Sequence, residues 1–128
     1  ESGARHVDVW GTGSASREYL YVDDAAQAIV RAAEADDQSG IVEPINLGAD
    51  REVTIKETVE TIAQLVGFTG QLRWDPSKPD GQPRRGVDGS RANRLLGWQP
   101  AMNFDEGLRN TIDWYIANRA EAERDPHA

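Results

Sequence analysis

Short segments with strand character alternate along this chain with segments that have the period of an amphipathic helix. Strand character is found at 7–10, 18–22, 41–47 and 72–74, and helical character at 25–35, 55–66, 90–96 and from about 105 onward. A chain with this alternation folds as a mixed α/β domain, in which helices cover a small sheet. Its 128 residues amount to one domain at most.

Local signals predict where the helices begin and end. Asp23 or Asp24 is expected to cap the helix at 25–35, and this reading is favoured over a catalytic or metal-binding carboxylate pair. Thr54 and Glu57 have the spacing of a capping box, and Ser90 is expected to cap the next helix. The charged tail at 118–128 is expected to fray. One face of the first helix is apolar, through Ala26, Ile29, Val30 and Ala33.

Composition excludes several classes of function. The net charge is −8, from 22 acidic and 14 basic residues, which disfavours nucleic acid as a partner. The sequence has no Cys, and its two His residues are far apart, so we expect no metal site. We find no apolar run that approaches the roughly 20 residues of a membrane span, and no signal peptide. We therefore expect a cytoplasmic protein without a membrane partner. The chain begins at Glu1 rather than Met, which suggests an excised piece.

A polar loop at 75–89 is the main anomaly, because structureless loops of this length are uncommon in compact domains unless they have a function. It contains Arg84 and Arg85. Guanidinium groups match phosphate oxygens in a bidentate way, so these two residues and Arg17 are the candidates for anion binding. The alternative is a pair of exposed charges on a loop.

Trp10 lies beside a glycine-rich turn, where its ring can either stack on a flat base or pack in the core. The turn itself, 11–14, does not complete a dinucleotide fingerprint. Ser16 stands where the third glycine would be required, and a strand rather than a helix follows. We therefore expect a tight hairpin turn. No Tyr is followed four residues later by Lys, and no G-x-S-x-G motif occurs, so we assign no catalytic residue to the chain.

Two motifs carry a family resemblance. Residues 10–24, WGTGSASREYLYVDD, resemble the W-G-x-G-x-x-x-R-E-[FY]-L-x-V-D-D segment of GDP-L-fucose synthases, which are members of the extended short-chain dehydrogenase/reductase superfamily. Residues 77–85, SKPDGQPRR, resemble the S-K-P-D-G-x-P-R-[KR] segment of the same enzymes. Two further segments, 46–48 and 96–100, resemble the N-x-G and L-G-W-x-P motifs of the wider superfamily.

The resemblance implies a fold and a role. Such enzymes join an amino-terminal Rossmann domain that holds NADP(H) to a smaller carboxy-terminal domain that binds the sugar nucleotide. Residues 1–128 would be that second domain, without the Rossmann domain, without the catalytic Ser/Tyr/Lys set and without a cofactor of their own. The intact enzyme, expected as a homodimer, would convert GDP-4-keto-6-deoxymannose by epimerisation and NADPH-dependent reduction. This chain alone would be inactive and would expose an apolar face toward the missing domain.

The resemblance also supplies expected contacts to a GDP-sugar. The expected substrate-binding residues are Trp10, Arg17, Asp80, Arg84 and Arg85, with Asp80 the weaker assignment. Arg85 stands where many of these enzymes have Lys, and Tyr19 where Phe is common. Two rival interpretations stay open: another nucleotide-sugar epimerase, dehydratase or reductase of the superfamily, and a non-catalytic nucleotide-sugar-binding module.

Overall fold

The computed structural model describes residues 5–35, 43–49 and 51–124. Strand β1 (His6–Trp10) pairs in parallel with β4 (Gln71–Asp75). In a second sheet, β2 (Ser16–Glu18) lies between β3 (Glu52–Thr54), which is antiparallel to it, and β5 (Arg84–Arg85), which is parallel. The helices are α1 (Val22–Glu34), α2 (Ile55–Leu65), α3 (Ser90–Leu96), α4 (Phe104–Ala117) and α5 (Arg119–Ala122). The expected mixed α/β fold is confirmed.

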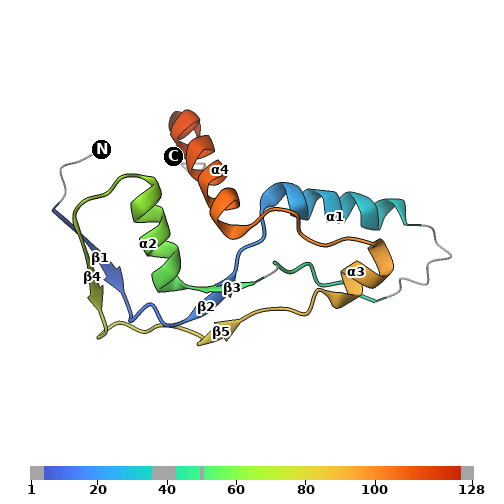
Figure 1. The fold of residues 1–128 in the computed structure, drawn as a ribbon, viewed down its shortest axis with the longest axis horizontal. Coiled ribbons are helices and arrows are strands. Elements are labelled where there is room, and N and C mark those ends of the chain that lie inside the picture. The colour runs from blue at the N-terminus through green and yellow to red at the C-terminus, as the bar shows by residue number, and fades with distance from the viewer. Residues whose placement is uncertain (1–4, 36–42, 50, 125–128) are drawn as a thin grey trace.

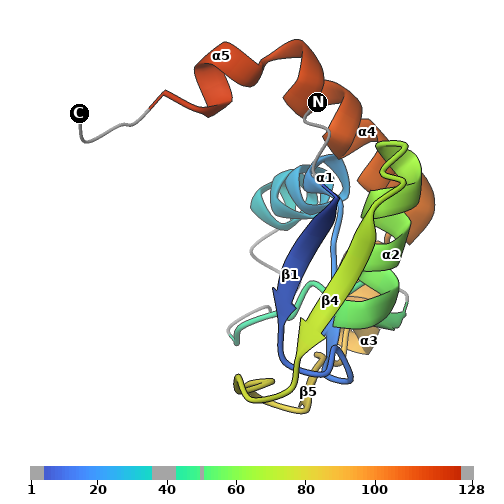
Figure 2. The same ribbon diagram turned by 90° about the vertical axis from the view of Figure 1, so that its left-hand side faces the viewer.

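Helices α1, α2 and α4 lie on one side of the short strands, and β5 lies at the opposite edge. In Figure 1, α1, α2 and α4 lie above the strands and β5 lies at the lower edge. Figure 2 shows β1 and β4 side by side, with α2 next to β4. The segment that leads into β5 therefore runs along an outer edge of the molecule, where a ligand can reach it.

The strand predicted at 18–22 is wrong after its first residue, because β2 spans Ser16–Glu18 and the aromatic run that follows packs against a helix instead. β2 ends at Glu18, where its pairing with Glu52 ends, and α1 begins at Val22. The ring of Tyr19 lies 5.7 Å from that of Phe104, centroid to centroid. The aromatic residues that suggested a strand thus form part of a helix-packing layer.

The strand predicted at 41–47 is not found in the part that the structure describes. Residues 41 and 42 lie outside the described residues, and 43–49 form no strand. Ile45 and Leu47 pack against a buried cluster of Ala28, Ala92 and Trp98. Their apolar character is therefore used in side-chain packing and not in a backbone ladder.

The prediction that Asp23 or Asp24 caps α1 is wrong. The capping position is occupied by Tyr21, whose side chain makes no capping bond, and both aspartates lie in the first turn. Asp24 is only 4% exposed. One oxygen of its carboxylate accepts from the backbone N–H groups of Ala101 (3.1 Å) and Met102 (2.9 Å). Asp24 thus joins α1 to the segment before α4.

The other caps are closer to expectation. The Thr54 hydroxyl accepts from the backbone N–H of Glu57 at 3.0 Å, as predicted, whereas the Glu57 carboxylate pairs with Arg51 at 2.8 Å instead of returning to the cap. Ser90 does not cap α3, of which it is the first residue. Instead, the Asp88 carboxylate accepts from the backbone N–H of Ser90 at 2.8 Å.

The core is small, and the apolar face of α1 is exposed. The buried apolar residues are Ala15, Ala28, Val53, Ala92, Trp98 and Phe104. Ile29 and Val30 are 62% and 53% exposed, because α1 turns Ala28 and Asp24 inward. Within the tail at 118–128, residues 119–122 form the short helix α5, with an ion pair between Arg119 and Glu123 at 2.9 Å, and 125–128 lie outside the described residues.

Candidate functional site

The loop predicted at 75–89 is fastened along the open edge of β2. The backbone N–H of Ser16 donates to the Pro83 carbonyl oxygen at 2.8 Å, and the next two residues of the loop form β5. A strand edge carries backbone groups that need hydrogen-bond partners, and the loop supplies them. The prediction of a structureless loop is therefore wrong at its two arginines.

The pleat of this sheet sends the two arginines to opposite faces. Arg85 is aligned with Arg17, and Arg84 is aligned with Ser16. Aligned residues on neighbouring strands share a face, and successive residues alternate between faces. Arg85 therefore lies beside Arg17, whereas Arg84 lies on the face that also carries Glu52.

Arg84 is bound by the protein itself. Its Nε donates to Glu52 Oε1 at 2.7 Å, and a second guanidinium nitrogen closes the ion pair. The hydrogen bond from the Arg84 guanidinium lowers the pKa of the Glu52 carboxyl below its ordinary value, and the hydrogen bond from the Ser16 hydroxyl lowers it further. Arg84 is not among the residues that line the neighbouring cavity.

Arg17 and Arg85 line one cavity of about 370 Å³. The Arg17 Nη1 donates to the Gln82 carbonyl oxygen at 2.8 Å, which fixes one edge of its guanidinium. The Arg85 side chain makes no hydrogen bond or ion pair with any residue that the structure describes. Tyr19 and Leu47 supply ring and apolar surface to the same cavity. The arrangement can bind an anion that carries an adjoining flat or apolar group.

Trp10 lies apart from this cavity. Its side chain is 71% exposed at the end of β1, and the Lys78 ammonium group lies 5.5 Å from its ring centroid. The turn after it is tight, with positive φ angles at Gly11 and Gly13. The prediction of a hairpin turn is wrong, because β1 pairs with β4 and β2 pairs with β3 and β5. The turn therefore connects the two sheets.

Asp80 fastens the loop to that turn. Its carboxylate accepts from the Thr12 hydroxyl at 2.6 Å and from the Thr12 backbone N–H. Both hydrogen bonds lower the pKa of the Asp80 carboxyl, and the one from the Thr12 hydroxyl has the larger effect. A Cβ atom at position 11 would collide with the Asp80 carboxylate, so the close approach requires Gly11. The carboxylate is thus directed at the protein's own backbone.

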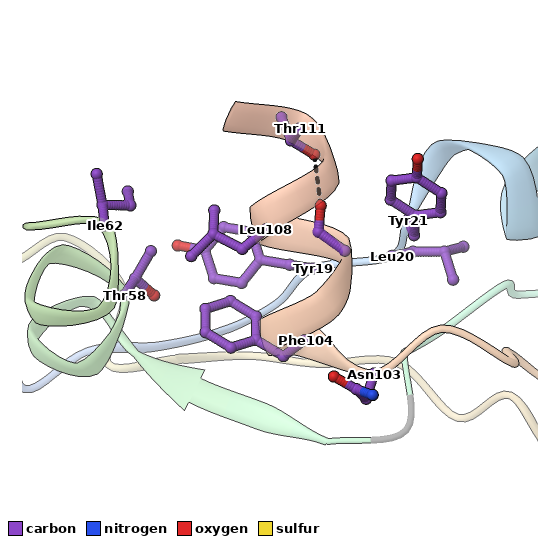
Figure 3. A pocket seen from close by; sticks show the side chains of 10 residues that line it. Tyr19, Leu20, Tyr21, Thr58, Ile62, Asn103, Phe104, Leu108 and Thr111 are labelled. Atoms are coloured by element: carbon purple, nitrogen blue, oxygen red, sulfur yellow. Dashed lines mark hydrogen bonds between the residues drawn. The ribbon is translucent and has the colours of Figure 1, made fainter. Parts of the chain in front are cut away.

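A second cavity, of about 250 Å³, lies between α2 and α4 (Figure 3). Tyr19, Phe104 and Ile62 line it with rings and apolar groups. The hydroxyl of Thr58 donates to the Thr54 carbonyl oxygen, and the hydroxyl of Thr111 to that of Gly107. These two hydroxyls are therefore satisfied by backbone carbonyls, and the rest of the lining is mostly rings and apolar groups. Sequence reasoning missed it, since it depends on how two separate helices pack.

Within 5–35, 43–49 and 51–124, no group of three His, Cys, Asp or Glu residues is placed to hold a metal ion. None of the helices in these ranges is both long enough and apolar enough to cross a membrane.

Comparison with known proteins adds a family to this geometry. Residues 1–48 match the family model described as the NAD dependent epimerase/dehydratase family. The probable GDP-L-fucose synthase 1 of Oryza sativa subsp. japonica is 46% identical over 123 residues, which are 96% of this chain and 36% of that protein.

Two solved structures are similar in fold. A GDP-L-fucose synthetase from Naegleria fowleri bound to NADP has a TM-score of 0.77 and 28% identity, over 90% of this chain and 36% of that one. A UDP-glucose 4-epimerase from Thermotoga maritima with UDP-glucose has a TM-score of 0.77 and 27% identity, over 89% and 36%. The chain thus spans little more than a third of the length of each of these three proteins.

Proposed function

We propose, since this chain belongs to the NAD dependent epimerase/dehydratase family, that it is the substrate-binding part of an NADP-dependent sugar-nucleotide epimerase/reductase. The observation that carries the proposal is the cavity in which Arg17 and Arg85 lie side by side. Two guanidinium groups from adjacent strands match the two phosphates of a nucleoside diphosphate, and each can bind phosphate oxygens in a bidentate way.

The relatives support a GDP-sugar as the substrate. The curated relatives at 46–48% identity are named GDP-L-fucose synthases, probable in one case and putative in another. We therefore propose GDP-4-keto-6-deoxymannose, which the complete enzyme would epimerise twice and reduce at the 4-keto group. The part described above would bind the diphosphate and orient the sugar. Orientation of this kind lowers a reaction barrier, because the entropy of bringing the reacting groups together is lost on binding and not in the transition state.

The residues of this chain do not fit the cofactor. The G-T-G turn leads into strand β2 and not into a helix, and Ser16 stands in the place of the third glycine. We therefore assign no chemical step to NADPH through these residues. We propose that a part of the enzyme outside this sequence holds it and supplies the hydride.

A specific observation favours a second candidate. The fold is as similar to a UDP-glucose 4-epimerase as to the GDP-L-fucose synthetase, with a TM-score of 0.77 in both cases. A different base on the same diphosphate would use the same two arginines. Competition between GDP, UDP and dTDP for the complete protein separates the two candidates, because the base is the part of the ligand that differs.

The test of the proposed function is titration of the complete protein with GDP by calorimetry. Arg85→Ala and Arg17→Ala should each weaken GDP binding by about 1.5–3 kcal/mol, the range for a hydrogen bond that involves a charged group. Arg85→Lys should cost less, because it keeps the charge. Binding of NADPH should be almost unchanged in all three variants.

Arg109→Ala is the matched control, because it removes an exposed positive charge from α4, away from the cavity. It should leave GDP binding as it is. Unchanged GDP affinity in both alanine variants, with the fold intact by circular dichroism, would contradict the proposed site. Loss of NADPH binding instead would place the arginines at the cofactor.

A further inference from the structure

Glu52 joins all three strands of the second sheet. It lies on β3, and its carboxylate reaches past the central strand β2. Oε2 accepts from the hydroxyl of Ser16 on β2 at 2.7 Å, and Oε1 accepts from the Nε of Arg84 on β5 at 2.7 Å. The Glu52 side chain is 22% exposed and that of Arg84 is 75% exposed. Both carboxylate oxygens are thus used to hold neighbouring strands.

The strand that Glu52 holds has few other attachments. β5 is two residues long, and its backbone pairing extends to the bond between Ser16 N–H and the Pro83 carbonyl oxygen. On its far side, the backbone N–H of Val87 donates to the Glu18 carboxylate at 3.2 Å. So short a strand needs side-chain contacts in addition to its ladder.

The placement of β5 also brings two like charges together. Arg85 is aligned with Arg17 on one face of the sheet, and like charges opposite each other disfavour strand pairing. The ion pair of Glu52 with Arg84 lies on the other face of the same two strands. An attractive contact behind the sheet therefore offsets the repulsion in front of it.

We propose that Glu52 is a positioning residue, which through Arg84 holds β5 in register and so keeps Arg85 beside Arg17. The proposal rests on the proposed function only for the choice of GDP as the probe. Isolated surface ion pairs contribute little. This one differs because the same carboxylate also accepts from Ser16 on β2, so that Glu52 ties both β5 and the edge of β2 to β3.

The test uses Glu52→Gln in the complete protein, titrated with GDP. The amide keeps the shape but removes the charge, and the Kd for GDP should rise about three- to tenfold, the scale of coupling between neighbouring groups. Arg84→Gln breaks the same pair from its exposed side and should have the same effect. The two changes together should be no worse than either alone.

A double-mutant cycle with Arg85 distinguishes positioning from general destabilisation. If Glu52 acts by placing Arg85, then Glu52→Gln should have no further effect on GDP binding once Arg85→Ala is present. Glu57→Gln is the control, because it breaks another ion pair, between Glu57 on α2 and Arg51 just before β3. It should leave the Kd unchanged. An unchanged Kd in Glu52→Gln, or an equal loss in the Arg85→Ala background, would overturn the proposal.

A second measurement does not depend on GDP. Hydrogen exchange at the backbone N–H of Ser16, which donates to Pro83, should become faster in Glu52→Gln but not in Glu57→Gln. Unchanged exchange would overturn the proposal whatever the ligand is. Faster exchange in a protein that does not bind GDP would support the role of Glu52 and refute the proposed function.

Discussion

The carboxylate of Asp24 is the clearest case of a buried polar group that this fold requires. It receives two backbone N–H groups from the segment before α4, in a position that is 4% exposed. Buried backbone donors need an acceptor, and a charged acceptor is stronger than a neutral one. Asp23, the residue just before it, is exposed and makes no such contact. Adjacent residues of one type therefore differ widely in importance.

We predict that Asp24→Ala lowers the free energy of unfolding by about 2–4 kcal/mol, because it leaves two partly buried N–H groups without their charged acceptor. Asp24→Asn should cost less, since the amide oxygen can still accept. Asp23→Ala should stay within about 0.5 kcal/mol of the wild type, as exposed substitutions usually do. Urea unfolding followed by circular dichroism measures all three. Equal effects at the two positions would contradict the role assigned to Asp24.

The segment from Asp80 to Arg85 is held at both ends by carboxylates. Asp80 binds Thr12 at the turn, and Glu52 binds Arg84 at β5. Both carboxyls have a pKa below the ordinary values of 3.8 for Asp80 and 4.5 for Glu52. A group with a lowered folded pKa stabilises the fold above its ordinary pKa, and this contribution is lost as the pH falls through the lower folded pKa.

We therefore predict that this segment loosens below about pH 4 before the helices unfold. Amide hydrogen exchange should show a falling protection factor at the backbone N–H of Thr12 while that of Val59 in α2 is still high. Asp80→Asn should reduce the protection of Thr12 at pH 7 and remove most of its dependence on pH. A Thr12 protection factor that follows Val59 through the whole acid range would refute this prediction.

Elements that depend on neighbouring residues were predictable from the sequence, and elements that depend on distant ones were not. β1, β4 and the Thr54 cap follow from local alternation and spacing, and the structure has them. β5 exists because β2, 68 positions earlier, offers a free edge. Asp24 finds its partners 77 and 78 positions away. The pair Arg17 and Arg85 was expected to share a ligand, but only the register of two strands brings them together.

The apolar face of α1 is exposed in this chain and is not covered by any other element that the structure describes. Val22, Ile29 and Val30 are each more than half exposed on one helix. Contiguous apolar surface of this kind marks a contact with another protein part. The relatives are nearly three times longer than the stretch they share with this chain, since the chain covers 36% of the first of them. We propose that α1 packs against the part of the enzyme that holds the cofactor.

On this basis, we predict that the 128-residue chain by itself associates and binds a hydrophobic dye through α1. Replacing Ile29 and Val30 by Glu should reduce both effects without unfolding the chain, because their side chains are already exposed. Ile116→Glu, at a similarly exposed site on α4, is the control and should change neither. Sedimentation velocity and dye fluorescence measure the outcome. A wild-type monomer that binds no dye would contradict the prediction.

The register of β5 against β2 sets a limit on how this protein can change during evolution. Arg85 rather than Arg84 lies on the face of Arg17 because the loop delivers the two arginines to β2 in one register. The loss or gain of a single residue between Asp80 and Pro83 would exchange the two faces, as any one-residue slip does in a sheet. Point substitutions in that stretch keep its length and so leave each arginine on its present face. Homologous lineages that keep the site should therefore vary freely in the composition of this stretch but differ in its length by an even number of residues or not at all.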